Sequence, residues 1–197
     1  SMAADVTIST PEQAATGQYH RGEWSDTLTL DGPESFHFAA VATGFGTIQV
    51  NEGVTATIAN LCTGDVGNGA EGTEGGGFWG NVVNGSHTFT VTGGGTLIAE
   101  HVSINSGQTI AVSGNLSLVN ISDGIISELE MQPGGMLIVE RGGTLDVTKA
   151  SKVEINSDNF RLDEGGKLKI SQGAELILTG DLEGDIIAEE STFHATG

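Results

Sequence analysis

Residues 134–178 read GGMLIVERGGTLDVTKASKVEINSDNFRLDEGGKLKISQGAELIL, and apolar residues recur there at intervals of eight, eight, seven, eight and eight positions. The first apolar row consists of Leu137, Leu145, Val153, Phe160, Leu168 and Leu176. A second row follows two residues after each of these, at Val139, Val147, Ile155, Leu162, Ile170 and Leu178. Apolar residues at every second position indicate short strands that each bury one face.

Three consecutive intervals span 23 residues, so each strand has a counterpart one 23-residue unit later. Repeated units of three short strands predict an all-β fold with strands stacked in parallel. This is a right-handed parallel β-helix, also called a β-solenoid. Neighbouring strands in such a stack lie about 4.8 Å apart. The spacing therefore predicts that Leu137 lies next to Phe160, and Val153 next to Leu176, with all four side chains pointing inward.

The same spacing predicts columns of residues on the outer surface. Asp146 is expected beside Lys169, and Thr144, Lys167 and Glu190 are expected in one column. Opposite charges on adjacent exposed strands contribute less than about 1 kcal/mol for each pair. Pairs of this kind are expected to offset neighbouring carboxylates.

Composition limits the classes of function. The chain has 197 residues, a formal net charge of −19 and 31 glycines. The length predicts a single domain with a sizeable core, and the negative charge argues against nucleic acid as a partner because phosphate backbones repel it. No apolar run reaches the roughly 18 residues of a spanning helix, so direct membrane insertion is not expected. Cys62 is the only cysteine, which excludes an intrachain disulfide.

The chain divides into an irregular beginning and a regular remainder. Residues 1–25 are interpreted as a lead-in or cap, and residues 26–197 as one β-helix domain. Residues 61–85 contain nine glycines with almost no alternation, which indicates one long loop insertion. The last strand is expected at 185–189, and no segment has a helical period, so almost no helix is expected. Early strands are expected at 27–30, 36–39, 47–50 and 56–59.

The pattern Gly-Gly-x-Leu occurs four times, at 94–97, 134–137, 142–145 and 165–168. Together with Gln172-Gly173-Ala174-Glu175-Leu176, it resembles the corners of secreted bacterial β-helices. The families concerned are autotransporter passengers and related large adhesins, with phage spike proteins second. The resemblance covers roughly 94–185. It implies display on a cell surface or a virion and supplies no catalytic residue.

Two adjacent aromatic residues, Phe78 and Trp79, stand in the glycine-rich insertion. Two interpretations remain open. They form an exposed loop tip on which a sugar ring or a partner surface packs, or they fold back and cover the stack of strands.

Acidic residues near the C-terminus raise the question of a metal. Asp181, Glu183 and Asp185 are weak candidates for calcium ligands, because calcium prefers carboxylate oxygens. The alternative is a solvated acidic end, and no other cofactor is expected. Carboxylate pairs suited to glycan hydrolysis are available almost anywhere in so acidic a chain, so their presence does not indicate an enzyme.

These observations predict a non-catalytic structural or adhesive module of a secreted or cell-surface bacterial protein. Its loops would bind a glycan or a surface protein. The alternative is a virion spike or fibre domain that binds host glycans, with a trimer as the expected homo-oligomer. A glycan-degrading enzyme is the third interpretation.

Overall fold

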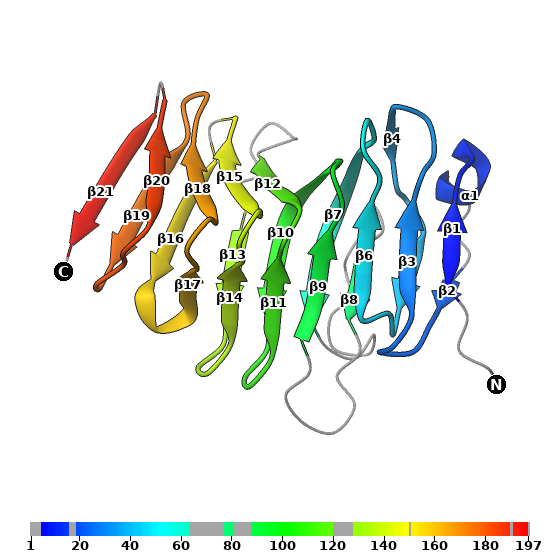
Figure 1. The fold of residues 1–197 in the computed structure, drawn as a ribbon, viewed down its shortest axis with the longest axis horizontal. Helices are drawn as coiled ribbons and strands as arrows, with labels where there is room; N and C mark the ends of the chain where they lie inside the picture. Colours follow the sequence, from blue (N-terminus) through cyan, green and yellow to red (C-terminus); the bar gives the residue numbers. More distant parts are fainter. Residues whose placement is uncertain are drawn as a thin grey trace.

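The computed structural model describes residues 5–15, 19–63, 77–80, 88–119, 128–149, 151–189 and 191–196. The chain is all-β. Its described strands form parallel sheets, with β1 and β21 at opposite ends of the molecule (Figure 1). Within these residues, helix is confined to α1 (Pro11–Ala15) and the short 3-10 helix η1 (Ser157–Asn159). Neither helix is long and apolar enough to cross a membrane.

Three sheets account for the described strands. The first runs in the order β1 (Val6–Ile8), β3 (Thr27–Leu30), β6 (Thr47–Val50), β9 (Thr88–Thr92), β11 (Thr109–Val112), β14 (Met136–Val139) and β17 (Phe160–Leu162). The second runs in the order β2 (Tyr19–Arg21), β5 (Val41–Thr43), β8 (Gly77–Gly80), β7 (Thr55–Thr63), β10 (Thr96–Ile104), β12 (Asn115–Val119), β15 (Thr144–Thr148), β18 (Lys167–Ile170) and β20 (Asp185–Ala188). In this second sheet β4 (Ser35–His37) pairs with β7, and β13 (Glu128–Met131) pairs with β10. The third consists of β16 (Lys152–Asn156), β19 (Glu175–Thr179) and β21 (Thr192–Thr196).

The predicted 23-residue register is confirmed in the second half of the chain, once in each sheet. Leu137 pairs with Phe160 in the first sheet, Leu145 with Leu168 in the second, and Val153 with Leu176 in the third. Each pairing is parallel. The predicted surface neighbours Asp146 and Lys169, and Thr144 and Lys167, also pair.

The register departs from 23 residues elsewhere. Ile48 pairs with Val91, across 43 positions of sequence, because β7 and β8 intervene. Beyond Lys167 the next residue in the column is Asp185, only 18 positions later, so the prediction that Glu190 continues this column is wrong. The strand expected at 185–189 is present as β20 (Asp185–Ala188), but it is not the last one, because β21 follows it and pairs with β19.

The core is a column of inward-facing apolar side chains. Half-buried and buried positions alternate along β3, β6 and β14, and β18 differs only in that its first residue is exposed. In the second sheet the column includes Leu97, Leu116, Leu145 and Leu168, which are at most 1% exposed. Burial of this kind contributes about 25 cal/mol for each Å² of apolar surface removed from water. The core is therefore held by contacts between neighbouring strands of the stack.

Three of the four Gly-Gly pairs, all but Gly94-Gly95, form tight turns between strands. In the turns 132–135, 140–143 and 163–166 the N–H of the fourth residue donates to the carbonyl of the first. The third residue is always a glycine with φ of 82 to 84°, as a type II turn requires. The second glycine has a different role. A Cβ on Gly143 would lie 2.1 Å from the carbonyl oxygen of Val112, at the end of β11, so only glycine lets the turn approach that strand.

The beginning of the chain joins the sheets. Strand β1 pairs with β3, and β2 pairs with β5, so residues 1–25 contribute strands as well as the helix α1. Ala14 in α1 is buried, and its carbonyl oxygen accepts hydrogen bonds from the backbone N–H groups of Ala39 and Ala40. Helix α1 thus packs onto the stack next to β4 at the N-terminal end (Figure 1).

Within the predicted loop insertion at 61–85, the structure describes residues 61–63 and 77–80, and both ranges are strand. Strand β7 continues through Leu61 to Thr63, and β8 (Gly77–Gly80) lies between β5 and β7, paired in parallel with both. Strand β8 follows β7 in sequence but precedes it in the sheet. The chain therefore turns back at this point, which an uninterrupted coil would not do.

Candidate functional site

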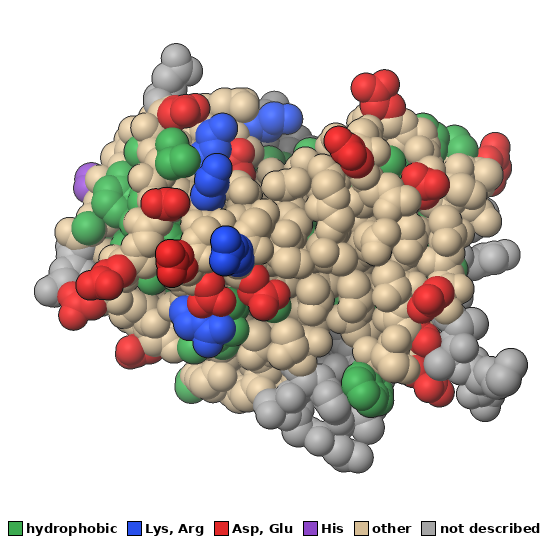
Figure 2. Space-filling view, viewed as in Figure 1, with side chains coloured by type: hydrophobic (Ala, Val, Ile, Leu, Met, Phe, Trp, Pro, Cys, Tyr) green, Lys and Arg blue, Asp and Glu red, His purple; other side chains and the backbone are tan. Residues whose placement is uncertain are grey.

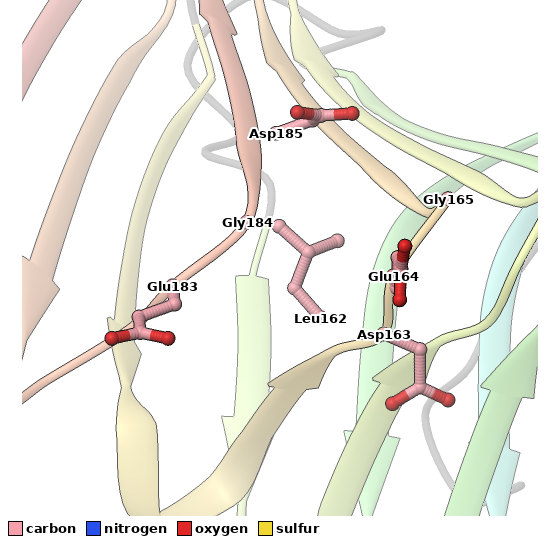
Figure 3. Close-up of a pocket in the computed structure, with 7 residues that line it drawn as sticks. All are labelled: Leu162, Asp163, Glu164, Gly165, Glu183, Gly184 and Asp185. Carbon is pink, nitrogen blue, oxygen red and sulfur yellow. The ribbon is translucent and has the colours of Figure 1, made fainter.

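One candidate site is a half-open cavity of about 290 Å³ beside the edge of β17 (Figure 3). The segment 180–184, between β19 and β20, adds no strand to the first sheet, which therefore ends at β17 in the described part of the chain. Gly184 packs directly on Leu162, because a Cβ at Gly184 would lie 2.5 Å from a methyl carbon of Leu162. The lining residues are Leu162, Asp163, Glu164, Gly165, Glu183, Gly184 and Asp185.

Carboxylates surround this cavity, and one is already paired. Figure 3 shows Glu183 to the left of Leu162, Asp185 above it, and Asp163 and Glu164 to its right. Asp163 accepts hydrogen bonds from Arg161, at 2.7 Å from Nε and 3.3 Å from a terminal nitrogen. Because the Arg161 side chain is 60% exposed, solvent weakens this ion pair. The cavity would attract cationic groups and offers a single apolar side chain at its centre.

The three predicted calcium ligands do not assemble into a metal site. Glu183 and Asp185 both line the cavity, whereas Asp181 lies outside its lining. No group of three or more Asp, Glu, His or Cys side chains in the described residues is placed to hold a metal ion. Calcium therefore stays an expectation from sequence.

Phe78 lies in the core. It is 1% exposed in β8, and its ring centre lies 4.8 Å from that of Phe38 at a tilt of 40°. This tilted contact is a favourable aromatic geometry. Phe78 is thus a core residue and not an exposed stacking platform. It does not fold back over the stack either, because β8 is itself a strand of the second sheet, between β5 and β7. Trp79 follows in the same strand, and its side chain lies outside the described residues.

A polar cluster lies at the corner of β15 and β18. The hydroxyl of Ser171 lies 3.1 Å from Oδ1 of Asp146 and 3.1 Å from Oγ1 of Thr148. Burial raises the pKa of Asp146, while the hydrogen bond from Ser171 and the positive charge of Lys169 act in the opposite direction. Burial therefore disfavours the ionised form of Asp146, and Ser171 and Lys169 offset part of this effect.

A second candidate is the outer surface of β1, β3, β6 and β9, which we call the threonine face. The outward side chains of these strands are Thr7, Thr27, Thr29, Thr47, Gln49, Thr88, Thr90 and Thr92. None is charged, although the chain carries 26 acidic residues. In Figure 2 the surface over these strands is free of charged side chains, which gather over the C-terminal strands and at the turns. The sequence interpretation missed this surface because it depends on the irregular register of β6 and β9.

No family model, curated protein or solved structure matches the chain.

Proposed function

We propose that the chain is a segment of a right-handed parallel β-helix that serves as a non-catalytic adhesive module of a secreted or cell-surface protein. The observation that carries this proposal is the stack itself. Leu137, Leu145 and Val153 each pair in parallel with the residue 23 positions later, one in each sheet. A chain that adds one strand to each of three sheets before repeating winds as a coil.

Such a stack is better suited to presenting binding groups on its outer faces than to catalysis. Each coil contacts only its neighbours, so length can grow while the outer faces keep one geometry. The outward positions alternate with the buried column and can vary without loss of core. Binding groups on these faces, or on segments between strands, would be held at fixed spacing along a stalk.

The partner would be a glycan or a surface protein. An array of immobilised glycans, probed with the labelled chain, tests the first directly. Specific binding without consumption of the bound glycan is the expected result. Release of sugar products would replace the proposal with a glycan-degrading enzyme, and a stable trimer in light scattering would favour a virion spike.

Comparison of variants would locate the binding surface. Arg161→Ala changes the rim of the acidic cavity, and Thr57→Lys changes the outer face of β7, while both leave the inward column intact. If neither variant nor the parent binds any glycan or surface protein, the adhesive function is rejected while the coil remains.

A further inference from the structure

Strand β8 fills a slot between two strands that the rest of the described chain leaves apart. Strand β4 pairs with residues 55–57 of β7, and β8 pairs with residues 60–63 of the same strand. Both lie on the side of β7 opposite β10. On its other side β8 pairs with β5. Without β8, the described strands would leave a slot one strand wide between β5 and residues 60–63 of β7.

The structure shows which sequence fits this slot. Phe78 is 1% exposed, and its ring contacts that of Phe38. Gly77 has a φ of 156°, and a Cβ on it would lie 2.2 Å from the carbonyl oxygen of Asn60. Parallel backbone pairing on both sides holds the main chain. The slot therefore selects an extended strand in which a glycine is followed by an aromatic residue.

Few groups hold β8 in the slot. The strand has four residues, two of them glycine, and Phe78 is the buried side chain that the structure describes in it. Glycine-rich strands specify their pairing weakly and are prone to exchange between molecules. Residues 64–76 and 81–87 connect β8 to β7 and β9, and a chain of the shorter length can extend over about 25 Å. A slot on a neighbouring molecule is therefore within reach.

We propose that the slot between β5 and β7 is a strand-acceptor site, and that β8 of a second copy fills it in place of the molecule's own β8. The second copy is the occupant because its β8 carries the sequence that the structure shows in the slot. Reciprocal exchange preserves the same backbone pairs and the same contact with Phe38 in both copies. The inference does not rest on the adhesive function, since it requires no glycan and no other protein.

Charge sets the conditions under which the exchange is expected. Each copy carries a formal net charge of −19, which opposes close approach of two copies. Salt screens this repulsion, and at about 0.5 M the screening length is only a few Å. Exchange should therefore increase with protein concentration and with ionic strength.

Cys62 provides a reporter of the exchange. It is the only cysteine, and it pairs in register with Trp79 of β8 on one side and with Ser103 of β10 on the other. Residues paired across adjacent strands have Cα atoms close enough for a disulfide. In Trp79→Cys the disulfide forms within one chain when β8 is in its own slot, and between two chains when β8 is exchanged. Non-reducing electrophoresis after mild oxidation should show both products, and the interchain fraction should rise with concentration.

Ser103→Cys is the matched control, because it offers the same partner, Cys62, from a strand that is not exchanged. Strand β10 pairs with β7 on one side and with β12 and β13 on the other. This variant should give the intrachain disulfide alone. Absence of the interchain product from folded Trp79→Cys at every concentration overturns the inference, and so does an equal interchain fraction in the two variants, which would indicate non-specific association.

A peptide tests the slot of the parent chain if circular dichroism shows that Trp79→Cys does not fold. The probe has the sequence of residues 75–82 with cysteine in place of Trp79, and it should form a disulfide with Cys62. The same peptide with alanine in place of Phe78 should react about tenfold less, because it lacks the ring that contacts Phe38. Equal reaction of the two peptides, or no reaction of either, overturns the inference.

Discussion

Replacing Leu145 with alanine tests the apolar column that supports the stack. Leu145 is fully buried in β15, between Leu116 on β12 and Leu168 on β18. Removing its three outer carbon groups forfeits about 0.8 kcal/mol of transfer free energy for each. The cavity left between rigid strands adds to this, so Leu145→Ala should lower the free energy of unfolding by about 3–5 kcal/mol.

Equilibrium unfolding in urea, followed by circular dichroism, provides the assay. Thr144→Ala is the control, because Thr144 is the outward neighbour of Leu145, and it should change the free energy of unfolding by less than about 1 kcal/mol. Ile186 lies in the same column, on β20, but is only partly buried. Ile186→Ala should therefore lower the free energy of unfolding by more than Thr144→Ala and by less than Leu145→Ala. Equal losses for Leu145→Ala and Thr144→Ala would refute the inward column.

Four further predictions concern single features. Asp146→Asn should increase the free energy of unfolding relative to the parent, and the increase should be largest at neutral pH. The reason is that the pKa of Asp146 in the folded state lies above its ordinary value of 3.8. The folded parent is therefore stabilised by the protonated carboxyl group at low pH and loses this stabilisation as pH rises through the folded-state pKa. Urea unfolding of both proteins at acid and neutral pH measures this difference, and a constant difference would contradict it. Gly143→Ala should cost roughly 1–3 kcal/mol in the same assay, because its Cβ would meet the carbonyl oxygen of Val112, and an unchanged midpoint would show that the turn moves freely. Phe78→Ala should cost about 3–5 kcal/mol, whereas an exposed ring would cost almost nothing. Sedimentation should show association as pH falls from 7 toward the isoelectric point of about 4.2, because carboxylate protonation removes the repulsion of a net charge of −19, and a monomer at both values would disprove this.

The regular part of the fold was predictable because its strands and turns are read from one local pattern. Leu137 and Phe160 are separated by two complete intervening strands and short turns, so counting residues gives their register. The pairing of Ile48 with Val91 could not be predicted by counting residues, because β8 lies between them in sequence and pairs with β7. The alternation of apolar and polar residues within a strand does not show which strand it pairs with. The last step from Lys167 shortens to Asp185 for a related reason: residues 180–184 add no strand to the first sheet.

Candidate sites were harder to predict than strands. Phe78 stands among glycines in the sequence, but its burial against Phe38 depends on where β8 enters the sheet. The acidic cavity depends on the close packing of Gly184 on Leu162, which no spacing reveals. The alternation of threonines at Thr27 and Thr29 was visible, yet their alignment with Thr47 required the pairing of β3 with β6.

Nuclear Overhauser contacts between backbone protons test the parallel, in-register stack most directly. In uniformly labelled protein, the pairs Leu137 and Phe160, Leu145 and Leu168, and Val153 and Leu176 should each show contacts between the amide protons of one strand and the α-protons of its neighbour. Parallel pairing keeps the facing α-protons apart, so contacts between the α-protons of these pairs should be weak. Strong contacts between α-protons, or a register shifted from 23 residues in these three pairs, would contradict the coil.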